Sequence, residues 1–222
     1  MPRTVFGCRT CCPVTAVSAL VALLLCATAL LLPTAPRADT PTAILLEDFE
    51  DGVGAWRTND STLMGEQRAA RYSGIYPTAD TPPSGGAQAG MIDFPPAKSA
   101  WASISLPVDG KLWAAHDIGV VSMWVKQSDA GSEVLVTLRV NAPTADGRIE
   151  DRSYYQVLRP DGKAWQRVSL RLFGFRDHEG ESLPPDLRSA IYLLQFVKTG
   201  SWERVRMYVD TIEARPPDYP ST

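Results

Sequence analysis

Short runs that alternate apolar and polar residues recur along most of the chain. In QRVSLRL (166–172), an aliphatic residue occupies every second position. RVRMYVDTI (204–212) repeats the pattern, with Val205, Met207 and Val209 on one face. Side chains alternate across a β-strand, so each run is expected to bury one face and expose the other. No apolar period of 3.6 residues is sustained anywhere after residue 39, so the pattern indicates strands rather than helices.

Ten runs of this kind are predicted as strands, two of them with a weaker pattern. The clear runs are Ala43–Phe49, Ser99–Leu106, Ile118–Gln127, Glu133–Asn141, Ser153–Arg159, Gln166–Leu172, Ala190–Lys198 and Arg204–Ile212, and the weaker ones are Ala69–Tyr76 and Ala87–Phe94. Many short strands separated by turn residues predict an all-β fold, an antiparallel β-sandwich of the jelly-roll type.

Turn residues separate these runs. Four Asp-Gly pairs occur, and such pairs adopt a positive φ at low cost. Pro160-Asp161-Gly162 predicts a hairpin between the strands on either side of it. ESLPPDLRS (181–189) is the only segment that suggests a short helical turn.

The first 38 residues differ from the rest of the chain. Met1–Cys12 contains two arginines and no acid, and Val14–Leu32 contains no charge. Small residues follow at 35–38, which is typical of a signal peptide and its cleavage region. The apolar run is also long enough to span a membrane, so an uncleaved N-terminal anchor helix is the alternative. We therefore expect an extracytoplasmic protein that is secreted, periplasmic or anchored at the cell surface, and that contacts a membrane only if the segment is retained.

These features divide the chain into a signal peptide or membrane anchor (1–38), a β-sandwich domain (39–214) and a Pro-rich disordered tail (215–222). All four cysteines lie in the first segment, so the domain is expected to be held by its own core without disulfides. The chain has 22 basic and 25 acidic residues, and the first segment contributes three of the arginines and no acid. This balance argues against binding to nucleic acid. We expect a monomer.

Catalytic motifs are missing from the sequence. His116 and His178 are its only histidines, and neither belongs to a metal-binding HExxH motif. A GxSxG elbow and a phosphate-binding loop are also missing. A Ser-His-Asp triad, or two facing carboxylates of a glycosidase, would have to assemble in space. A noncatalytic domain is therefore expected, with a jelly-roll glycoside hydrolase or lyase as the alternative.

An acid-rich stretch, EDFEDGVGAW (47–56), follows the first predicted strand. Asp48 and Glu50 share one strand face, and Asp210 lies on the polar face of the last strand. If the first and last strands pair, these carboxylates can converge, and clustered oxygens suit calcium. The alternative is a solvated acidic surface with nearby arginines as countercharges.

Aromatic residues divide into two groups. Trp56, Trp124 and Trp165 lie in apolar, strand-like contexts and are expected in the core. Several tyrosines, His178 and Phe196 lie near loops or on mixed faces. Aromatic rings in such places can stack on the apolar face of a sugar, or can be ordinary sandwich packing.

LLEDFEDGVGAW (45–56) resembles the opening of galactose-binding-like jelly rolls, notably the family-eleven carbohydrate-binding modules. The segment from Tyr154 to Ala214 resembles the C-terminal half of these modules, including its Pro-Pro loop and final V-D-x-I strand. The resemblance implies a domain that binds a polysaccharide or oligosaccharide in a groove on a sandwich face. It also implies a structural calcium ion near the first and last strands, at Asp48, Glu50 and Asp210.

The same resemblance suggests ligand-binding residues. FRDHEG (175–180) supplies Arg176, Asp177 and His178, with histidine where the family has an aromatic residue. A family tyrosine on the following strand falls at Phe196, and Tyr154 is a further candidate ring of the groove. A saccharide-binding domain should expose the rings of Tyr154, His178 and Phe196 along one groove, with Arg176 and Asp177 at its edge.

WRTNDSTLMGEQ (56–67) resembles the signature of a second jelly-roll family, the complex I intermediate-associated proteins. The matching residues are Trp56, Asn59, Asp60, Met64 and Gly65. Glu66 replaces the second glycine of that signature. This resemblance implies a protein-interaction or assembly domain without a glycan ligand.

Overall fold

A computed structural model describes residues 43–59, 74–94, 96, 102–128, 133–160, 162–198 and 203–217. They belong to one compact unit, Pro41–Thr222. The N-terminal segment, most of the WRTNDSTLMGEQ signature and the end of the tail lie outside the described residues. No helix within the described ranges is long and apolar enough to cross a membrane.

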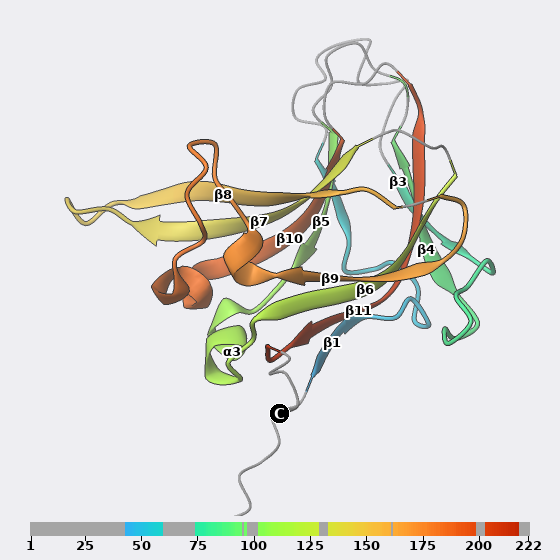
Figure 1. Cartoon of the computed structure of the whole chain (residues 1–222), viewed down its shortest axis with the longest axis horizontal. Coiled ribbons are helices and arrows are strands. Elements are labelled where there is room, and N and C mark those ends of the chain that lie inside the picture. The colour runs from blue at the N-terminus through green and yellow to red at the C-terminus, as the bar shows by residue number, and fades with distance from the viewer. Residues whose placement is uncertain are drawn as a thin grey trace, which may run out of the picture. The chain divides into compact units, whose positions relative to one another are not determined.

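The described strands form two antiparallel sheets (Figure 1). The six-stranded sheet has the order β3 (Gly74–Thr78), β4 (Ala89–Phe94), β11 (Val205–Arg215), β6 (Val120–Gln127) and β9 (Gln166–Arg171), and β1 (Ile44–Glu47) also pairs with β11. The five-stranded sheet has the order β2 (Arg57–Asn59), β5 (Ala102–Pro107), β10 (Ile191–Lys198), β7 (Val134–Pro143) and β8 (Ile149–Leu158). The predicted antiparallel β-sandwich is confirmed.

The core lies between the two sheets and follows the predicted alternation. Val205, Met207 and Val209 on β11 are almost completely buried. The rings of Phe49 and Trp56 stack with centroids 5.9 Å apart, and Trp56 and Phe196 stack at the same separation. Aromatic residues before β2 and on β10 thus fill the space between the sheets.

Strand β11 changes partners along one edge. Val205–Val209 pair with β4, whereas Ile212 and Ala214 pair with β1. Between these segments the register of β11 with β6 shifts, and Thr211 has a φ of 46°. A β-branched residue rarely adopts a positive φ, so the backbone is strained at this point. The first and last strands pair, which meets the condition for the acidic side chains to converge, and the irregularity falls next to Asp210.

The hairpin predicted at residues 160–162 is wrong. Strand β8 pairs with β7, and β9 pairs with β6, so the chain crosses between the sheets after β8. The tight hairpin is instead the connection from β7 to β8. Thr144 N donates to Arg148 O at 2.8 Å, and Gly147 has a φ of 81°.

Three elements of the described residues are helical. The 3-10 turn η2 (Pro185–Ala190) lies in the segment where a helical turn was predicted, while η1 (Leu172–Gly174) follows β9. Helix α3 (Gly110–Ala115) was not predicted, and neither was the short strand β2. The Asp109 carboxylate caps α3 by accepting from the backbone of Lys111 at 2.9 Å and of Leu112 at 3.2 Å. Trp113 anchors the helix in the core.

Candidate functional site

Polar residues form one row across the outer face of the five-stranded sheet. In order of pairing, they are Arg57 (β2), Ser105 (β5), Gln195 (β10), Thr137 (β7), Tyr155 (β8) and Arg176 in the loop beside β8. Paired residues direct their side chains to the same face of a sheet. The neighbouring residues Phe196 and Leu138 face the core, so this row, here called the polar row, lies on the outside.

The centre and the ends of the polar row differ in exposure. Ser105, Thr137 and Gln195 are buried, Tyr155 is half-buried, and the two arginines at the ends are exposed. A ligand that lies along the row would therefore meet Tyr155 and the arginines first, with the central side chains beneath them.

A charged cluster lies beside the row on the same face. Arg139 Nε donates to Asp151 Oδ1 at 3.0 Å, and Tyr192 Oη donates to the same oxygen at 2.9 Å. Burial acts to raise the pKa of Asp151, but these hydrogen bonds and the positive charge of Arg139 outweigh it and lower the pKa below 3.8. Asp151 is therefore ionised at neutral pH and its charge is compensated.

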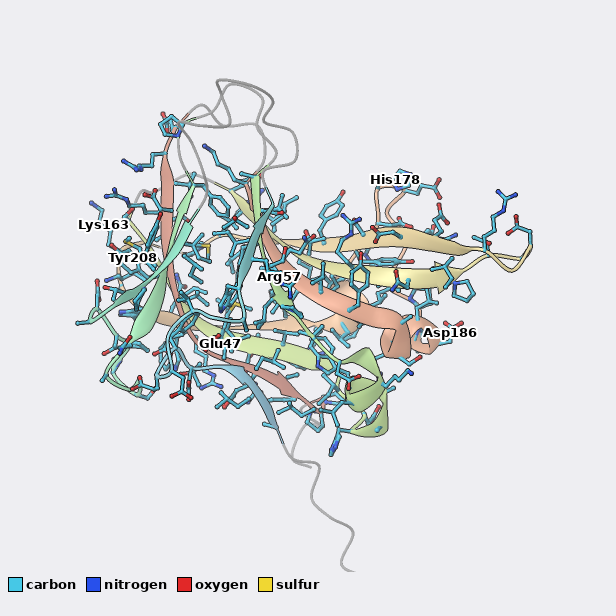
Figure 2. The ribbon with its side chains drawn as sticks, turned by 180° about the vertical axis from the view of Figure 1, so that it is seen from behind. Glu47, Arg57, Lys163, His178, Asp186 and Tyr208 are labelled. Atoms are coloured by element: carbon cyan, nitrogen blue, oxygen red, sulfur yellow. The ribbon has the colours of Figure 1, made fainter. Side chains whose placement is uncertain are left out.

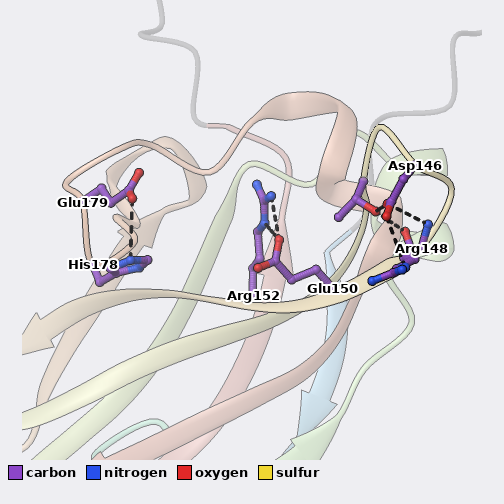
Figure 3. Close-up of polar contacts among 7 residues, drawn as sticks. Asp146, Arg148, Glu150, Arg152, His178 and Glu179 are labelled. Carbon is purple, nitrogen blue, oxygen red and sulfur yellow. Dashed lines mark hydrogen bonds and ion pairs between the residues drawn. The ribbon is translucent and has the colours of Figure 1, made fainter.

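A pocket of about 380 Å³ opens at β8 and the loop that follows η1. It is lined by Glu150, Asp151, Arg152, Ser153, Tyr155, Asp177, His178 and Glu179, and is here called the β8 pocket. Tyr155 belongs both to the pocket and to the polar row. Figure 2 places His178 beyond the outer face of this sheet. Figure 3 shows two contacts of the pocket, the ion pair Glu150–Arg152 on β8 and the approach of His178 Nε2 to Glu179 Oε1 at 3.8 Å on the loop.

The loop that carries Arg176 is attached to the edge of β8. Tyr155 N donates to Arg176 O at 2.7 Å, and Arg176 N donates to Tyr155 O at 3.1 Å. Within the loop, Asp177 Oδ1 accepts from the backbone of Glu179 at 3.0 Å and of Glu181 at 2.9 Å. The hydrogen bond from Glu181 is the main cause of a lowered pKa for Asp177. Asp177 thus fixes the loop shape, while the His178 side chain is 87% exposed.

The structure therefore brings Asp177 and His178 to the β8 pocket and places Arg176 beside Tyr155, but it corrects the rest of the predicted set. Tyr154 is only 2% exposed and Phe196 is fully buried, so the expectation that these rings are exposed is wrong. Tyr154 pairs with Leu138, and Phe196 stacks on Trp56. Both side chains belong to the inner face of their strands.

Tyr155, and not the predicted Tyr154, is the tyrosine that faces outward. The sequence SYYQV carries tyrosine at both parities, so the alternation alone does not show which ring faces outward. The buried Leu158, three residues after Tyr155 and four after Tyr154, was the available signal, because residues an even number apart share a face.

The acid-rich stretch has a structural role. Glu47 Oε2 accepts from Trp56 Nε1 at 2.8 Å, and Glu47 Oε1 accepts from the backbone of Phe49 at 2.8 Å. Glu50 Oε1 accepts from the backbone of Gln88 at 2.9 Å. These carboxylates thus hold the turn after β1, the indole of Trp56 and the loop before β4 in place.

Asp210 on β11 lies near two acids of this stretch, Asp48 and Glu50. Its side chain is fully buried on the outer face of β11; Oδ1 accepts from the backbone of Thr211 at 2.6 Å, while Oδ2 has no hydrogen-bond partner. Burial raises the pKa of Asp210, and the negative charges of Glu50 and Asp48 act in the same direction. The backbone of Gly85 lies so close that a Cβ atom there would be 2.4 Å from Oδ2.

An unpaired buried carboxylate oxygen beside two further carboxylates fits a cation, because a cation would supply the missing partner. Within the described residues, however, no group of three or more acidic, histidine or cysteine side chains is arranged to hold a metal ion. A calcium ion at Asp210 would therefore need backbone carbonyl oxygens among its ligands.

Comparisons with known proteins bear on the fold. No protein-family model and no curated protein matches the sequence. Solved structures do match. A family 11 carbohydrate-binding module from Clostridium thermocellum, in complex with a β-1,3-1,4-mixed-linked tetrasaccharide, aligns with a TM-score of 0.59 at 16% identity over 78% of this chain and 95% of that chain.

Two further structures match similarly. A family 30 carbohydrate-binding module of a Clostridium thermocellum cellulosomal cellulase aligns with a TM-score of 0.53 at 12% identity, over 80% of this chain and 99% of that one. An exo-β-agarase aligns with a TM-score of 0.52 at 13% identity over 79% of this chain, but over only 25% of its own chain. The described part of the protein thus has the β-sandwich fold of carbohydrate-binding modules, which confirms the resemblance to family eleven at the level of the fold. The resemblance to complex I intermediate-associated proteins stays a prediction.

Proposed function

We propose that this chain is a noncatalytic domain that binds a saccharide chain across the outer face of the five-stranded sheet. The observation that carries the proposal is that Tyr155 belongs both to the polar row and to the β8 pocket, with Arg176 bridged to it through the backbone. The fold supports it, because structures with this fold include carbohydrate-binding modules.

The chemistry of the junction suits a sugar. A half-buried tyrosine ring offers a face on which the apolar C–H side of a pyranose can stack. The guanidinium group of Arg176 and the carboxylates of the β8 pocket supply donors and acceptors for hydroxyl groups. This combination of one ring with many hydrogen-bonding groups replaces the three exposed rings that the sequence suggested.

The charges around the pocket favour a neutral saccharide. Glu150 pairs with Arg152, and Asp151 pairs with Arg139, so neither pair leaves a net charge. Asp177 and Glu179 add further negative charge to the pocket. A polyanionic ligand would meet these carboxylates, whereas a neutral polysaccharide would use them as acceptors.

The dimensions favour an oligosaccharide over a single sugar. Arg57 and Arg176 are separated by five strand spacings along the polar row. At about 4.8 Å per spacing, the row is roughly 24 Å long. A chain of several sugar units can contact both ends.

We expect the protein to act outside the cytoplasm and as a monomer.

Calcium is a second part of the proposal. Asp210, with Glu50 and Asp48 nearby, is proposed to hold a structural calcium ion together with backbone carbonyl groups. The unpartnered Oδ2 of Asp210 supports this assignment. The ion would neutralise a buried charge and tie the loop before β4 to β11, which stabilises the sandwich without any role in catalysis.

The binding proposal can be tested by titrating the full-length protein with the β-1,3-1,4-mixed-linked tetrasaccharide, followed by a panel of neutral polysaccharides. Tyr155→Ala and Arg176→Ala should each weaken binding, by roughly tenfold for loss of a stacked ring or a charge-assisted hydrogen bond. Arg148→Ala is the matched control, since this exposed arginine lies in the β7–β8 hairpin and pairs only with Asp146 (Figure 3).

The control variant should bind like the unmodified protein. If no neutral saccharide binds, the proposal fails, and the protein-interaction domain implied by the second resemblance becomes the better hypothesis. If binding occurs but is unaffected by both variants, the site lies elsewhere on the sandwich.

A further inference from the structure

The opposite face of the sandwich carries a second row of side chains, most of them aromatic. In order of pairing across the six-stranded sheet, they are Tyr76 (β3), Met91 (β4), Tyr208 (β11), Lys126 (β6) and Trp165, which directly precedes β9. The row is here called the aromatic row. Trp165 was expected in the core, but it lies on this outer face because Gln166 pairs with Val125, which places Trp165 beside Lys126. Figure 2 shows Tyr208 and His178 well apart on the molecule.

Polar contacts hold one end of the aromatic row in place. Trp165 Nε1 donates to Asp80 Oδ1 at 3.2 Å, and Lys126 forms an ion pair with the same carboxylate. The ammonium of Lys126 lies 4.5 Å from the ring centroid of Tyr208, and the rings of Trp165 and Tyr208 meet edge to face at 6.3 Å. Rings fixed in this way lose little conformational entropy when a ligand binds against them.

The other end of the row has a different arrangement. A Cβ atom on Gly74 would lie 2.3 Å from Tyr76 Oη and 2.4 Å from the adjoining ring carbons. The ring of Tyr76 therefore lies across its own strand, directly over Gly74. Tyr76 is nevertheless 49% exposed. The ring thus lies along the sheet surface with one side covered by backbone and the other open.

Hydrogen-bonding groups lie next to this open ring. Gly74 pairs with Asp93, and Asp93 accepts from Arg204 Nε at 2.8 Å, with Arg206 Nε 3.6 Å away. A flat exposed ring with a carboxylate and guanidinium groups at its edge offers what a sugar needs, which is an apolar surface for its C–H face and partners for its hydroxyl groups.

We infer that the aromatic row is a second saccharide-contact surface, separate from the polar row and on the other sheet. Tyr76 provides the stacking ring, and the Asp80–Lys126–Trp165–Tyr208 cluster provides a rigid continuation. Because the Tyr76 ring lies along the sheet face, its open side can stack on the flat side of packed polysaccharide chains such as insoluble cellulose. This inference goes beyond the proposed function, which concerns a single chain bound at the β8 pocket.

The test measures depletion of the full-length protein from solution by insoluble cellulose. Tyr76→Ala should weaken the binding by roughly three- to tenfold, the effect of losing one stacked ring. Gly74→Ala keeps the tyrosine but pushes its ring away from the sheet, and should weaken binding similarly. The fold should tolerate it, because the clashing atoms are the far end of a flexible side chain. Phe173→Ala, which removes an exposed ring outside both rows, should have no effect.

A Tyr155→Ala background separates this inference from the proposed function. There, binding to the soluble tetrasaccharide should fall, while the remaining binding to cellulose should still depend on Tyr76. Three results would overturn the inference: no binding to cellulose, binding that is indifferent to Tyr76→Ala or to Gly74→Ala, or cellulose binding that Tyr155→Ala abolishes. Loss of a protein partner from Tyr76→Ala, with cellulose binding intact, would reassign the surface to protein recognition.

Discussion

Gln195 donates a hydrogen bond of 2.8 Å from its Nε2 to Oγ of Ser105, while its own Oε1 is buried without a partner. The two residues are paired across β5 and β10 in the centre of the polar row. The amide is therefore half satisfied, and Ser105 provides the hydrogen bond that it has.

Ser105→Ala should consequently destabilise the protein more than its small change in volume suggests. Both ends of the buried amide would then lack partners, which costs about 1–3 kcal/mol in the free energy of unfolding. Gln195→Met should cost less, since it removes the unpaired oxygen together with the donor. The double variant should lose less free energy of unfolding than the sum of the losses in the two single variants.

Urea denaturation of the two single variants and the double variant measures this coupling. Ser153→Ala is the control. Ser153 lies in β8 on the same face of the sheet, and the expected change is within about 0.5 kcal/mol. Equal effects of Ser105→Ala and Ser153→Ala would show that the Gln195 amide finds another partner.

The contact of Asp151 with Arg139 and Tyr192 predicts a pH dependence. The pKa of Asp151 is lowered below 3.8 in the folded protein, so its contribution to stability is present above that value and is lost as the pH falls through the folded pKa. The pKa of Tyr192 is raised above 10.0, mainly by burial and also by Asp151. That contribution is present below pH 10 and is lost as the pH rises through the folded pKa.

The stability difference between the unmodified protein and Asp151→Asn should therefore be constant from about pH 5 to pH 9. It should shrink on the acid side as Asp151 is protonated. Thermal unfolding measured within this range and on both sides of it is the test. For Tyr192→Phe, the stability difference from the unmodified protein should shrink as the pH rises above about 10 and the tyrosine is ionised. A difference that keeps its full size well below pH 3.8 would contradict the lowered pKa.

Calcium should stabilise the protein if Asp210 holds the ion. A cation that binds only the folded state adds about 2.7 kcal/mol when its concentration is a hundred times the dissociation constant. Asp210→Asn should abolish the calcium-dependent rise in Tm. Without calcium, the same variant should be at least as stable as the unmodified protein, because it removes a buried charge whose Oδ2 lacks a partner.

Differential scanning calorimetry with calcium and with a chelator distinguishes the possibilities. A Tm that does not change on chelation excludes the ion. A calcium effect that survives Asp210→Asn would place the ion at another site. Asp51→Asn, an exposed acid in the same stretch, is the matched control and should respond to calcium as the unmodified protein does.

The strands and the sandwich could be predicted because alternation directly reflects burial. Val205, Met207 and Val209 alternate in sequence and are buried in the structure. The pairing partner of each strand was harder to predict. Two strands can flank a turn and either pair with each other or belong to different sheets. Pro160 and Gly162 indicate a turn in both cases, and the alternation of the flanking strands is the same in both. The hairpin prediction failed for this reason.

The candidate site was harder to predict because a shift of one position along a strand moves a side chain to the opposite face of the sheet. Tyr154 and Tyr155 are chemically identical and adjacent, yet one is in the core and the other borders the β8 pocket. Asp177 and His178 do line the β8 pocket, and a local loop motif sufficed to place them together; their binding role stays a prediction. The polar row was not, since its members come from strands distant in sequence and meet only through register.

Glu47 gives the last prediction, and it concerns the opening acid of EDFEDGVGAW. Its carboxylate accepts hydrogen bonds from the indole of Trp56 and from the backbone of Phe49, both at 2.8 Å. Trp56 is buried between Phe49 and Phe196, so its N–H group would have no partner without Glu47. Glu47→Ala should lower the free energy of unfolding by about 1–3 kcal/mol. Glu47→Gln retains one acceptor oxygen and should cost less.

Chemical denaturation followed by tryptophan fluorescence measures this effect, and Asp51→Ala serves as the control, with a change within about 0.5 kcal/mol. The two acids lie four residues apart in the same negatively charged stretch. If like-charge repulsion dominated the stretch, removing either acid would stabilise the protein. A stabilising Glu47→Ala would therefore show that repulsion outweighs the hydrogen bond to Trp56, whereas the geometry predicts the opposite sign for Glu47 because its two oxygens are already engaged.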